Sequence, residues 1–335
     1  MKALIQKLVE ATGPSGYESQ VRNLVKAEVK PHADEISVDA MGNLIVRKGT
    51  LQKNGQKIML SAHIDEIGVI VTHIDENGFL RFTNLGGVRA YNHIGGRVRF
   101  LDGRIGVIGV ERMSGSDLPG LDKLFIDVGA SSRKDCPVKV GDVAAFERPF
   151  TVLEVNGSTR LVSKAMDDRI SVAVLIETLR GVKQTPHELY FVFSVQEEVG
   201  LRGATTAAFG IDADLGLAVD VTLTGDTPKG TKMEVSLGKG PAIKVRDGGM
   251  LSDPRIVDWM VRGATKAKLP YQLEVLEGGT TDARAMQVSR SGMPAGCVSI
   301  PCRYVHSPSE MVDLADVENA VRLLVELISK PVNLG

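Results

Sequence analysis

Two histidines and several carboxylates stand beside apolar segments of this chain, where they could act together on a metal ion. His63 directly follows the apolar run Ile58–Ala62, and His306 lies shortly after the run Ala295–Ile300. Acidic residues stand at similar junctions, namely Asp167 and Asp168, Glu197 and Glu198, and Asp220. In open α/β sheets the functional crevice lies outside the carboxyl ends of the strands. Separate segments would therefore deliver imidazole and carboxylate groups to one site.

Neighbouring carboxylates at an apolar strand end need positive charge, and two divalent metal ions would provide it. Such carboxylates are unfavourable unless something cationic neutralises them. If Asp167, Glu198 and Asp220 are ligands and the histidines are neutral, two divalent ions leave one positive charge, which a bridging hydroxide cancels. Mixed histidine and carboxylate ligation favours zinc, cobalt or manganese over calcium or magnesium. Two such ions activate water and stabilise a developing oxyanion.

The paired glutamates are expected to divide two tasks. One is a metal ligand, and the other acts as general base on the water and later protonates the leaving amine. Asp65, two residues after His63, is placed to accept the other imidazole N–H and to fix the tautomer. Each motif alone also has a structural explanation: Glu-Glu as a solvated turn and Asp-Asp as a helix N-cap. Their joint position at segment ends favours the dinuclear site.

The remaining histidines and the cysteines fit structural roles better. His187 follows Thr-Pro in a loop and is expected at the surface, as is His32. Cys302 precedes His306 by four residues, but no base stands beside it, so packing is the expected role. Residues expected to be structural are His32, His73, His93 and His187, and the cysteines expected to be reduced thiols are Cys136, Cys297 and Cys302.

A polar, glycine-rich segment, Gly278–Ala283, precedes an expected helix. Its backbone N–H groups are candidates to bind an anion or a substrate backbone. The residues singled out for substrate binding are Gly279, Thr280 and Asp282. The segment is not a nucleotide-binding Walker motif, because the Gly-Lys-Ser/Thr element is missing.

The distribution of strand and helix patterns predicts an α/β fold with an inserted β-domain. Apolar, strand-like runs alternate with helical patterns up to residue 68 and again from residue 164, which is typical of an α/β sheet. Between residues 69 and 163 the runs are short, Gly-punctuated and partly alternating, which predicts a small barrel or sandwich. We therefore expect a discontinuous α/β domain of residues 1–68 and 164–335, with residues 69–163 inserted.

Composition excludes several classes of partner and location. The 335 residues carry 40 Lys and Arg against 41 Asp and Glu, a net charge of −1, which gives no support to a nucleic-acid or anionic-membrane partner. The N-terminal apolar residues stand at helical spacing, which indicates an amphipathic helix rather than a signal peptide. No apolar run approaches the roughly 18 residues that span a bilayer. We therefore expect a cytoplasmic protein.

The motifs occur in the order and rough spacing of one family, and the sequence resembles the tetrahedral (TET) aminopeptidases. These are also called deblocking or glutamyl aminopeptidases and are often labelled cellulase M or endoglucanase. The resemblance covers essentially the whole chain. It is carried by five ordered motifs: Ser61-Ala-His-Ile-Asp-Glu-Ile-Gly68, Ala165-Met-Asp-Asp-Arg169, Gln196-Glu-Glu-Val-Gly200, Gly278-Gly-Thr-Thr-Asp-Ala283 and Arg303-Tyr-Val-His-Ser-Pro308.

The resemblance implies a zinc-peptidase-like α/β/α sandwich with an inserted small β-domain, barrel or PDZ-like, used for dimerisation. It implies two co-catalytic metal ions, zinc or cobalt, a cytoplasmic home, and dimers that commonly assemble into a hollow tetrahedral dodecamer. Carried over residue by residue, it gives the bridging ligand Asp167, the general base Glu197, the imidazole partner Asp65, and the further ligands His63, Glu198, Asp220 and His306.

The resulting functional prediction is a metal-dependent aminopeptidase that acts on peptides. A carboxypeptidase or an N-acyl amino acid hydrolase would use the same metal chemistry, and only the specificity pocket separates them. A glucanase is disfavoured, because glycosidase grooves are usually lined by aromatic residues and the chain has one Trp. A non-catalytic protein that kept the fold would have lost the base or a ligand, yet Glu197 and all expected ligands are present.

Overall fold

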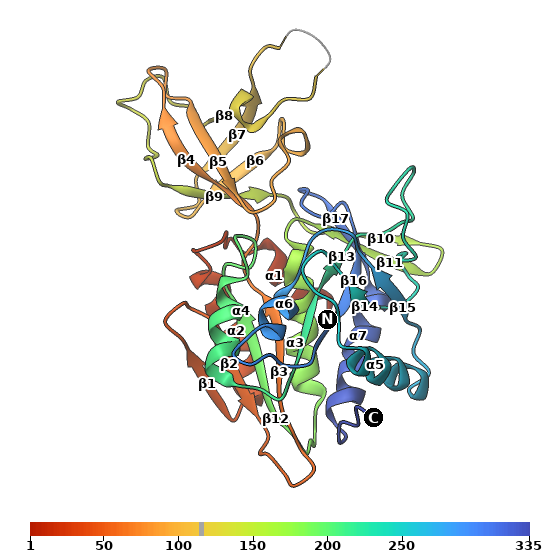
Figure 1. The fold of residues 1–335 in the computed structure, drawn as a ribbon. Coiled ribbons are helices and arrows are strands. Elements are labelled where there is room, and N and C mark those ends of the chain that lie inside the picture. The colour runs from red at the N-terminus through yellow and green to blue at the C-terminus, as the bar shows by residue number, and fades with distance from the viewer. Residues whose placement is uncertain (114–116) are drawn as a thin grey trace.

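A computed structural model describes residues 1–113 and 117–335, and it shows a small β-barrel standing on a larger α/β unit (Figure 1). Residues 114–116, which belong to the segment predicted to be inserted, lie outside the described residues. The helices are α1 (Lys2–Glu10), α2 (Ser19–Val29), α3 (Met166–Gly181), α4 (Arg202–Ile211), α5 (Pro254–Lys266), α6 (Asp282–Gln287) and α7 (Leu314–Ile328), with 3₁₀ turns η1 (Lys30–His32), η2 (Ala90–Asn92) and η3 (Leu121–Lys123).

The α/β unit is built on one mixed sheet that contains eleven strands within the described residues. Its order is β1-β2-β12-β3-β13-β16-β17-β11-β10, and β14 and β15 join beside β16. These strands are β1 (Glu35–Val38), β2 (Leu44–Lys48), β3 (Lys57–His63), β10 (Thr151–Val155), β11 (Ser158–Ser163), β12 (Glu188–Ser194), β13 (Leu215–Thr222), β14 (Ala242–Arg246), β15 (Gln272–Val275), β16 (Ala295–Arg303) and β17 (Glu310–Asp313).

The four central strands run in the same direction. Strand β3 pairs in parallel with both β12 and β13, and β13 pairs in parallel with β16. Their carboxyl ends therefore meet at one edge of the sheet. The chain leaves β3 at this edge and enters the barrel at once, so the edge faces the barrel (Figure 1).

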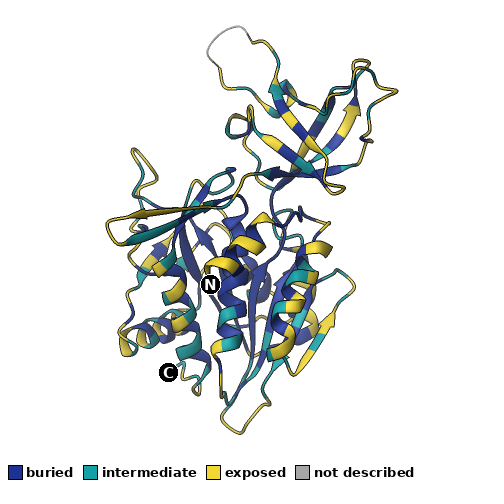
Figure 2. Ribbon diagram, turned by 180° about the vertical axis from the view of Figure 1, so that it is seen from behind, coloured by how far each residue is buried: buried dark blue, intermediate teal, exposed yellow. Residues whose placement is uncertain are grey.

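Helices cover both faces of the sheet, which confirms the predicted α/β/α sandwich. Alternate side chains of a strand point to opposite faces. On one face, Leu60 and Leu217 pack in the main hydrophobic core with residues of α1, α2, α3, α5 and α7. On the other face, Met59 and Ala218 pack with α4 and α6. The central strands are buried between these layers, while edge strands and the outer faces of the helices are exposed (Figure 2).

The inserted unit is a closed barrel with its own core, as the Gly-punctuated pattern predicted. Its strand order is β4-β5-β8-β7-β6-β9, closed by pairing of β9 with β4. Side chains such as Val69, Phe82 and Ile126 fill the interior. The strands are β4 (Gly68–Ile74), β5 (Leu80–Leu85), β6 (Arg97–Phe100), β7 (Ile105–Val110), β8 (Leu124–Asp127) and β9 (Val143–Glu147).

Strands β10 and β11 were assigned by the sequence to the inserted segment 69–163, and the structure pairs them differently. They form a hairpin whose strand β11 pairs with β17, so both belong to the large sheet. The barrel itself closes with β9, which ends at Glu147. The reason is that an alternating pattern identifies a strand but not the sheet it joins.

His187 is a correction to the surface position expected from the sequence. It is fully buried, accepts the Gln56 N–H at Nδ1 (2.9 Å), and its Nε2 lies 2.8 Å from the carbonyl oxygen of Lys330. The Thr-Pro dipeptide before it correctly marked a loop, but this loop packs against the C-terminal segment. Cys297 and Cys302 are buried, as expected for packing residues. Among the described residues, no helix has the length and apolar character needed to cross a membrane.

A buried cluster of charged side chains connects the N-terminal segment of the chain to the start of α3. Glu66 lies 2.6 Å from Lys164 Nζ and 3.3 Å from an Arg169 guanidinium nitrogen, and all three side chains are nearly inaccessible. Arg169 also donates to the carbonyl oxygens of Leu8 in α1 and of Gly13 shortly after that helix. Glu66 is therefore the only acidic ion-pair partner of two buried cations among the described residues.

Replacing Glu66 by alanine is expected to destabilise the folded state strongly. Lys164 and Arg169 would remain buried without their counter-ion, and breaking a buried pair in this way costs about 3–5 kcal/mol. Urea unfolding of the metal-free protein measures the difference in the free energy of unfolding. Glu154→Ala is the control, because the Lys2–Glu154 pair is exposed and contributes little. Equal stability of the two variants would contradict this prediction.

Candidate metal centre

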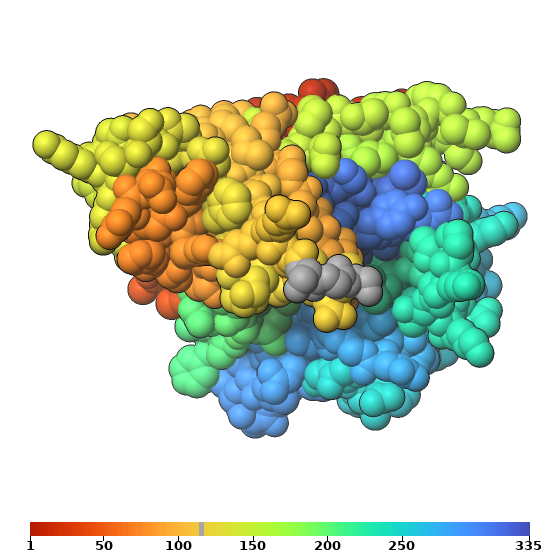
Figure 3. Space-filling view, turned by 90° about the horizontal axis from the view of Figure 1, so that it is seen from above, coloured from red at the N-terminus to blue at the C-terminus, as the bar shows by residue number. Residues whose placement is uncertain are grey.

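The parallel sheet edge brings the predicted ligands together beside one cavity. His63 ends β3, Asp220 lies near the end of β13, the Glu197–Glu198 pair follows β12, and His306 follows β16. The cavity measures about 1250 Å³ and is lined by residues of the sheet edge and of the barrel. Seen from above, the barrel overlies one side of the α/β unit next to C-terminal segments (Figure 3).

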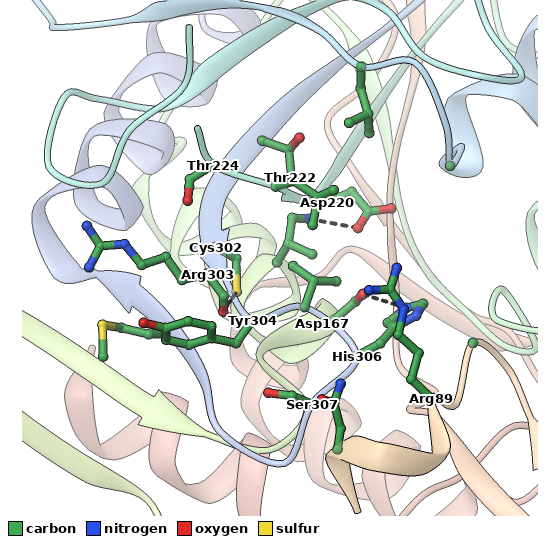
Figure 4. A pocket seen from close by; sticks show the side chains of 18 of the residues that line it. Arg89, Asp167, Asp220, Thr222, Thr224, Cys302, Arg303, Tyr304, His306 and Ser307 are labelled. Carbon is green, nitrogen blue, oxygen red and sulfur yellow. Dashed lines mark hydrogen bonds and ion pairs between the residues drawn. The ribbon is translucent and has the colours of Figure 1, made fainter. Parts of the chain in front are cut away.

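Five predicted ligands form two groups that share one carboxylate. In the first group, ligand atoms of His63, Asp167 and Asp220 lie within 4.8 Å of one another, and in the second those of Asp167, Glu198 and His306 do. The two Asp167 oxygens face different histidines: Oδ1 lies 3.0 Å from His63 Nε2, and Oδ2 lies 3.2 Å from His306 Nε2. Figure 4 shows Asp167 and His306 facing each other at the cavity wall.

Asp65 contacts the Ser15 side chain, the loop of Glu197 and Glu198, and the His63 ring. Its carboxylate accepts the Ser15 hydroxyl (2.6 Å) and the backbone N–H groups of Glu197 (3.0 Å) and Glu198 (3.2 Å). It also lies 3.4 Å from His63 Nδ1, the ring nitrogen that points away from Asp167. Asp65 is therefore placed to orient the imidazole and, at the same time, the loop that carries the glutamate pair.

Glu310 is a supporting residue that the sequence analysis missed. Its two carboxylate oxygens accept the backbone N–H groups of Asp167 (3.0 Å) and His306 (2.8 Å), so it ties both segments together. His306 adopts a left-handed backbone conformation with φ of 61°, which this contact helps to hold. The available signal was an acidic residue four positions after His306, but hydrogen bonds to backbone groups leave no mark in a sequence.

Some residues of the glycine-rich segment Gly278–Ala283 line the cavity, and others are buried in the interior. Gly279 and Thr280 line the cavity, where a substrate would reach them. Asp282 does not line it: its carboxylate is buried and accepts the hydroxyl groups of Ser61 and Ser194. Direct substrate binding by Asp282 is therefore corrected to support of β3 and β12, because the first turn of α6 points its side chain toward the sheet.

The electrostatics of the site fit bound cations. Burial and the charges of nearby carboxylates raise the pKa of Glu197 and of Asp220 well above their ordinary values. Burial also opposes ionisation of Asp167, but its hydrogen bonds with His306 and His63 lower the pKa of that carboxyl. Within the described residues, no Lys or Arg pairs with Asp167, Glu197, Glu198 or Asp220. Glu198 Oε1 is buried without a hydrogen-bond partner.

The donor set is one that zinc-like ions prefer. Two imidazoles and three carboxylates suit borderline metals such as zinc, cobalt and manganese better than calcium or magnesium. Excess buried negative charge in the absence of basic partners is the condition that divalent cations relieve. Glu197 lies outside both ligand groups, with its Oε2 3.9 Å from His63 Nε2, and lines the cavity.

This fold and site define a family, and the chain belongs to it. The M42 glutamyl aminopeptidase family matches residues 42–323. A protein from Acetivibrio thermocellus that carries an aminopeptidase name is 47% identical over 97% of both chains. Aminopeptidase APDkam598 from the archaeon Desulfurococcus kamchatkensis superposes with a TM-score of 0.92 at 42% identity, covering 98% of this chain and 94% of that one.

An assembly-forming protein has the same fold over its full length. The TET1 peptidase of Pyrococcus horikoshii, which can assemble into a tetrahedron or a large octahedral shell, superposes with a TM-score of 0.86 at 32% identity. The match covers 98% of this chain and 99% of that one. The resemblance stated from the five sequence motifs is therefore confirmed at the level of family and fold.

Replacing Asp65 by asparagine is expected to weaken metal binding about 10- to 100-fold, the usual effect of changing a residue that orients a ligand. The amide nitrogen would face one of the N–H or O–H donors that the carboxylate now accepts. Titration of the metal-free protein with Zn²⁺ measures the loss. Asp122→Asn, an exposed change in the barrel, serves as the control. Unchanged affinity in both variants would show that Asp65 does not position the site.

Proposed function

We propose that this protein is a metal-dependent aminopeptidase that removes N-terminal residues from peptides with the help of two divalent ions. The observation that carries the proposal is the position of Asp167 between two ligand groups, with one carboxylate oxygen toward each histidine. Membership of the M42 glutamyl aminopeptidase family supports the same reaction. The metal is zinc or cobalt, with manganese as a third option.

The residues would share the work as follows. His63 and Asp220 would hold one ion, Glu198 and His306 the other, and Asp167 both. When bound, two such ions supply an activated water and positive charge that stabilises a developing oxyanion. Glu197 takes the proton from the attacking water and gives it to the leaving amine. Asp65 keeps the His63 ring and the Glu197 backbone in the geometry that this proton transfer requires.

The amino terminus of the substrate would bind near the carboxylates beside the metals. Glu197, Glu198 and Asp220 line the cavity without basic ion-pair partners in the described part of the chain. A free α-amine is cationic and is attracted by a carboxylate that the metal ions leave uncompensated. Gly279 and Thr280, which also line the cavity, would contact the peptide backbone.

The experiment that tests this function is digestion of a mixed peptide pool by zinc- or cobalt-loaded protein, followed by mass spectrometry. Glu197→Ala is measured in parallel. Stepwise loss of N-terminal residues by the wild type alone establishes aminopeptidase activity and shows its side-chain preference. Shortening from the carboxyl end, or activity only on N-acylated amino acids, would assign the site to one of the alternative hydrolases. Intact peptides in every sample would refute the proposal.

Self-association in the cytoplasm completes the proposal. The barrel, which corresponds to most of the predicted insertion 69–163, would mediate dimerisation, and dimers would assemble further into a tetrahedral dodecamer. The outer surface of the barrel exposes apolar side chains, including Ile105 and Val107 on β7. The TET1 peptidase that shares this fold supports closed assembly. Light scattering of the metal-loaded protein measures the mass of the particle in solution. A monomeric mass at micromolar protein concentration would refute the proposed self-association.

A further inference from the structure

Two consecutive glycines of the barrel touch ligands of only one of the two metal groups. Gly86 and Gly87 follow β5 and precede η2, and they reach across from the barrel to the sheet edge. A Cβ atom at Gly87 would lie 2.2 Å from His306 Nδ1 and 2.5 Å from His306 Cε1. A Cβ atom at Gly86 would lie 2.8 Å from Glu198 Oε2 and 3.0 Å from Glu198 Cβ. His306 and Glu198 belong to the same group.

Backbone conformation explains glycine at one of these positions and not at the other. Gly86 has a φ of 81°, a left-handed value that by itself favours glycine in a turn. Gly87 has no such value, so its backbone would accept alanine. What meets a side chain at Gly87 is the His306 ring, because the three nearest atoms to that Cβ position all belong to this ring.

Contacts at the backbone N–H and at Nε2 restrain the His306 ring against moving away from Gly87. Its backbone N–H is held by Glu310 at 2.8 Å, and its Nε2 lies between Asp167 (3.2 Å) and Glu198 (3.4 Å). Gly87 lies against the edge of the ring that carries Nδ1 and Cε1. The loop itself is fastened by Asn84, whose side-chain amide donates to the Gly86 carbonyl oxygen at 2.7 Å.

The other ligand group takes His63 and Asp220 from strands of the α/β unit. His63 is 2% exposed and is oriented by Asp65 from within the α/β unit, whereas the His306 side chain is 30% exposed on the open side of the site. Asp220 lies in β13 at the centre of the sheet. One group is thus preformed by the α/β sheet, and the second depends on the barrel for its last contact.

We propose that Gly87 is a positioning residue through which the inserted barrel sets the affinity of the second metal group, that of Glu198 and His306. The inference rests on the two-ion site of the proposed function. A side chain at Gly87 pushes the His306 ring out of line and weakens the ion held there. The ion at His63 and Asp220 keeps its affinity, because nothing in its own surroundings changes except through the shared Asp167.

The test is titration of the metal-free Gly87→Ala protein with Co²⁺, followed by calorimetry and by visible absorption of the bound cobalt. The wild type is expected to bind two ions. In Gly87→Ala one ion is expected to bind as before, and the other about 10- to 100-fold more weakly, the range for residues that orient a ligand. Gly210→Ala is the control, since a Cβ there meets no atom within 4 Å.

The outcomes separate this inference from the proposed function. A wild type that binds fewer than two ions refutes the two-ion site. A wild type that binds two ions, together with a Gly87→Ala protein that binds both unchanged or loses both equally, overturns the role of Gly87. If Gly87→Ala does not fold, as judged by circular dichroism of the metal-free form, Asn84→Ala decides. That variant frees the same loop and is expected to weaken the same ion selectively, and unchanged binding of both ions overturns the role.

Discussion

Glu197→Gln is expected to lower kcat for peptide hydrolysis by about 10²- to 10⁴-fold while both metal ions stay bound. Glutamine keeps the size of the side chain but cannot accept the proton from the attacking water. Glu197 belongs to neither ligand group, so its replacement leaves the metal-binding donors intact. Its backbone N–H is held by Asp65 at 3.0 Å, and glutamine preserves this contact. Steady-state kinetics and the metal content per subunit measure the two halves of the prediction.

A second carboxylate of the same cavity provides the control for this experiment. Glu277 lines the cavity but is exposed and lies outside both ligand groups. Glu277→Gln is therefore expected to leave kcat within a few-fold of the wild type. If both glutamine variants lose activity equally, the effect of Glu197 comes from the overall charge of the cavity. If Glu197→Gln keeps full activity, another group is the base.

The position of the site was predictable because it depends on strand order, which the apolar runs reveal. His63 and Asp220 stand at the ends of two such runs, and parallel strands carry their carboxyl ends to the same edge. The structure brings all five predicted ligands into two groups there. Binding of metal by these residues stays a prediction, as does the role of Glu197.

The parts that the sequence did not predict are contacts between distant segments. Glu310 acts on the backbones of Asp167 and His306, and no residue type or spacing signals a bond to an N–H group. Strand β11 pairs with β17, about 150 residues later, which alternation cannot show. The sequence analysis did not single out the glycines at 86 and 87, and only the approach of His306 in the structure distinguishes Gly87. The sequence therefore predicts local elements well, and it fails where the structure depends on contacts between distant segments.

The aspartate pair offers the prediction with the widest consequence, because one member is expected to serve both metal groups. Asp167 presents one oxygen to each histidine. Asp168 instead accepts the His63 backbone N–H at Oδ2 (3.2 Å) and belongs to neither ligand group. Asp167→Ala is expected to abolish binding of both ions and to lower activity by roughly 10³-fold or more, since activated water and oxyanion stabilisation are lost together.

Asp168→Asn is the matched comparison, because asparagine retains an oxygen that accepts the His63 N–H. It is expected to bind two ions and to keep most of the activity. Thermal unfolding reports the same difference without substrate: saturating Zn²⁺ stabilises a protein that binds it, by about 2.7 kcal/mol per site at 100 times the Kd, and this gain should vanish in Asp167→Ala alone. If Asp168 proves to be the residue whose loss removes both ions, the geometry of Asp167 between the histidines describes only the metal-free site. The bridging role would then pass to its neighbour.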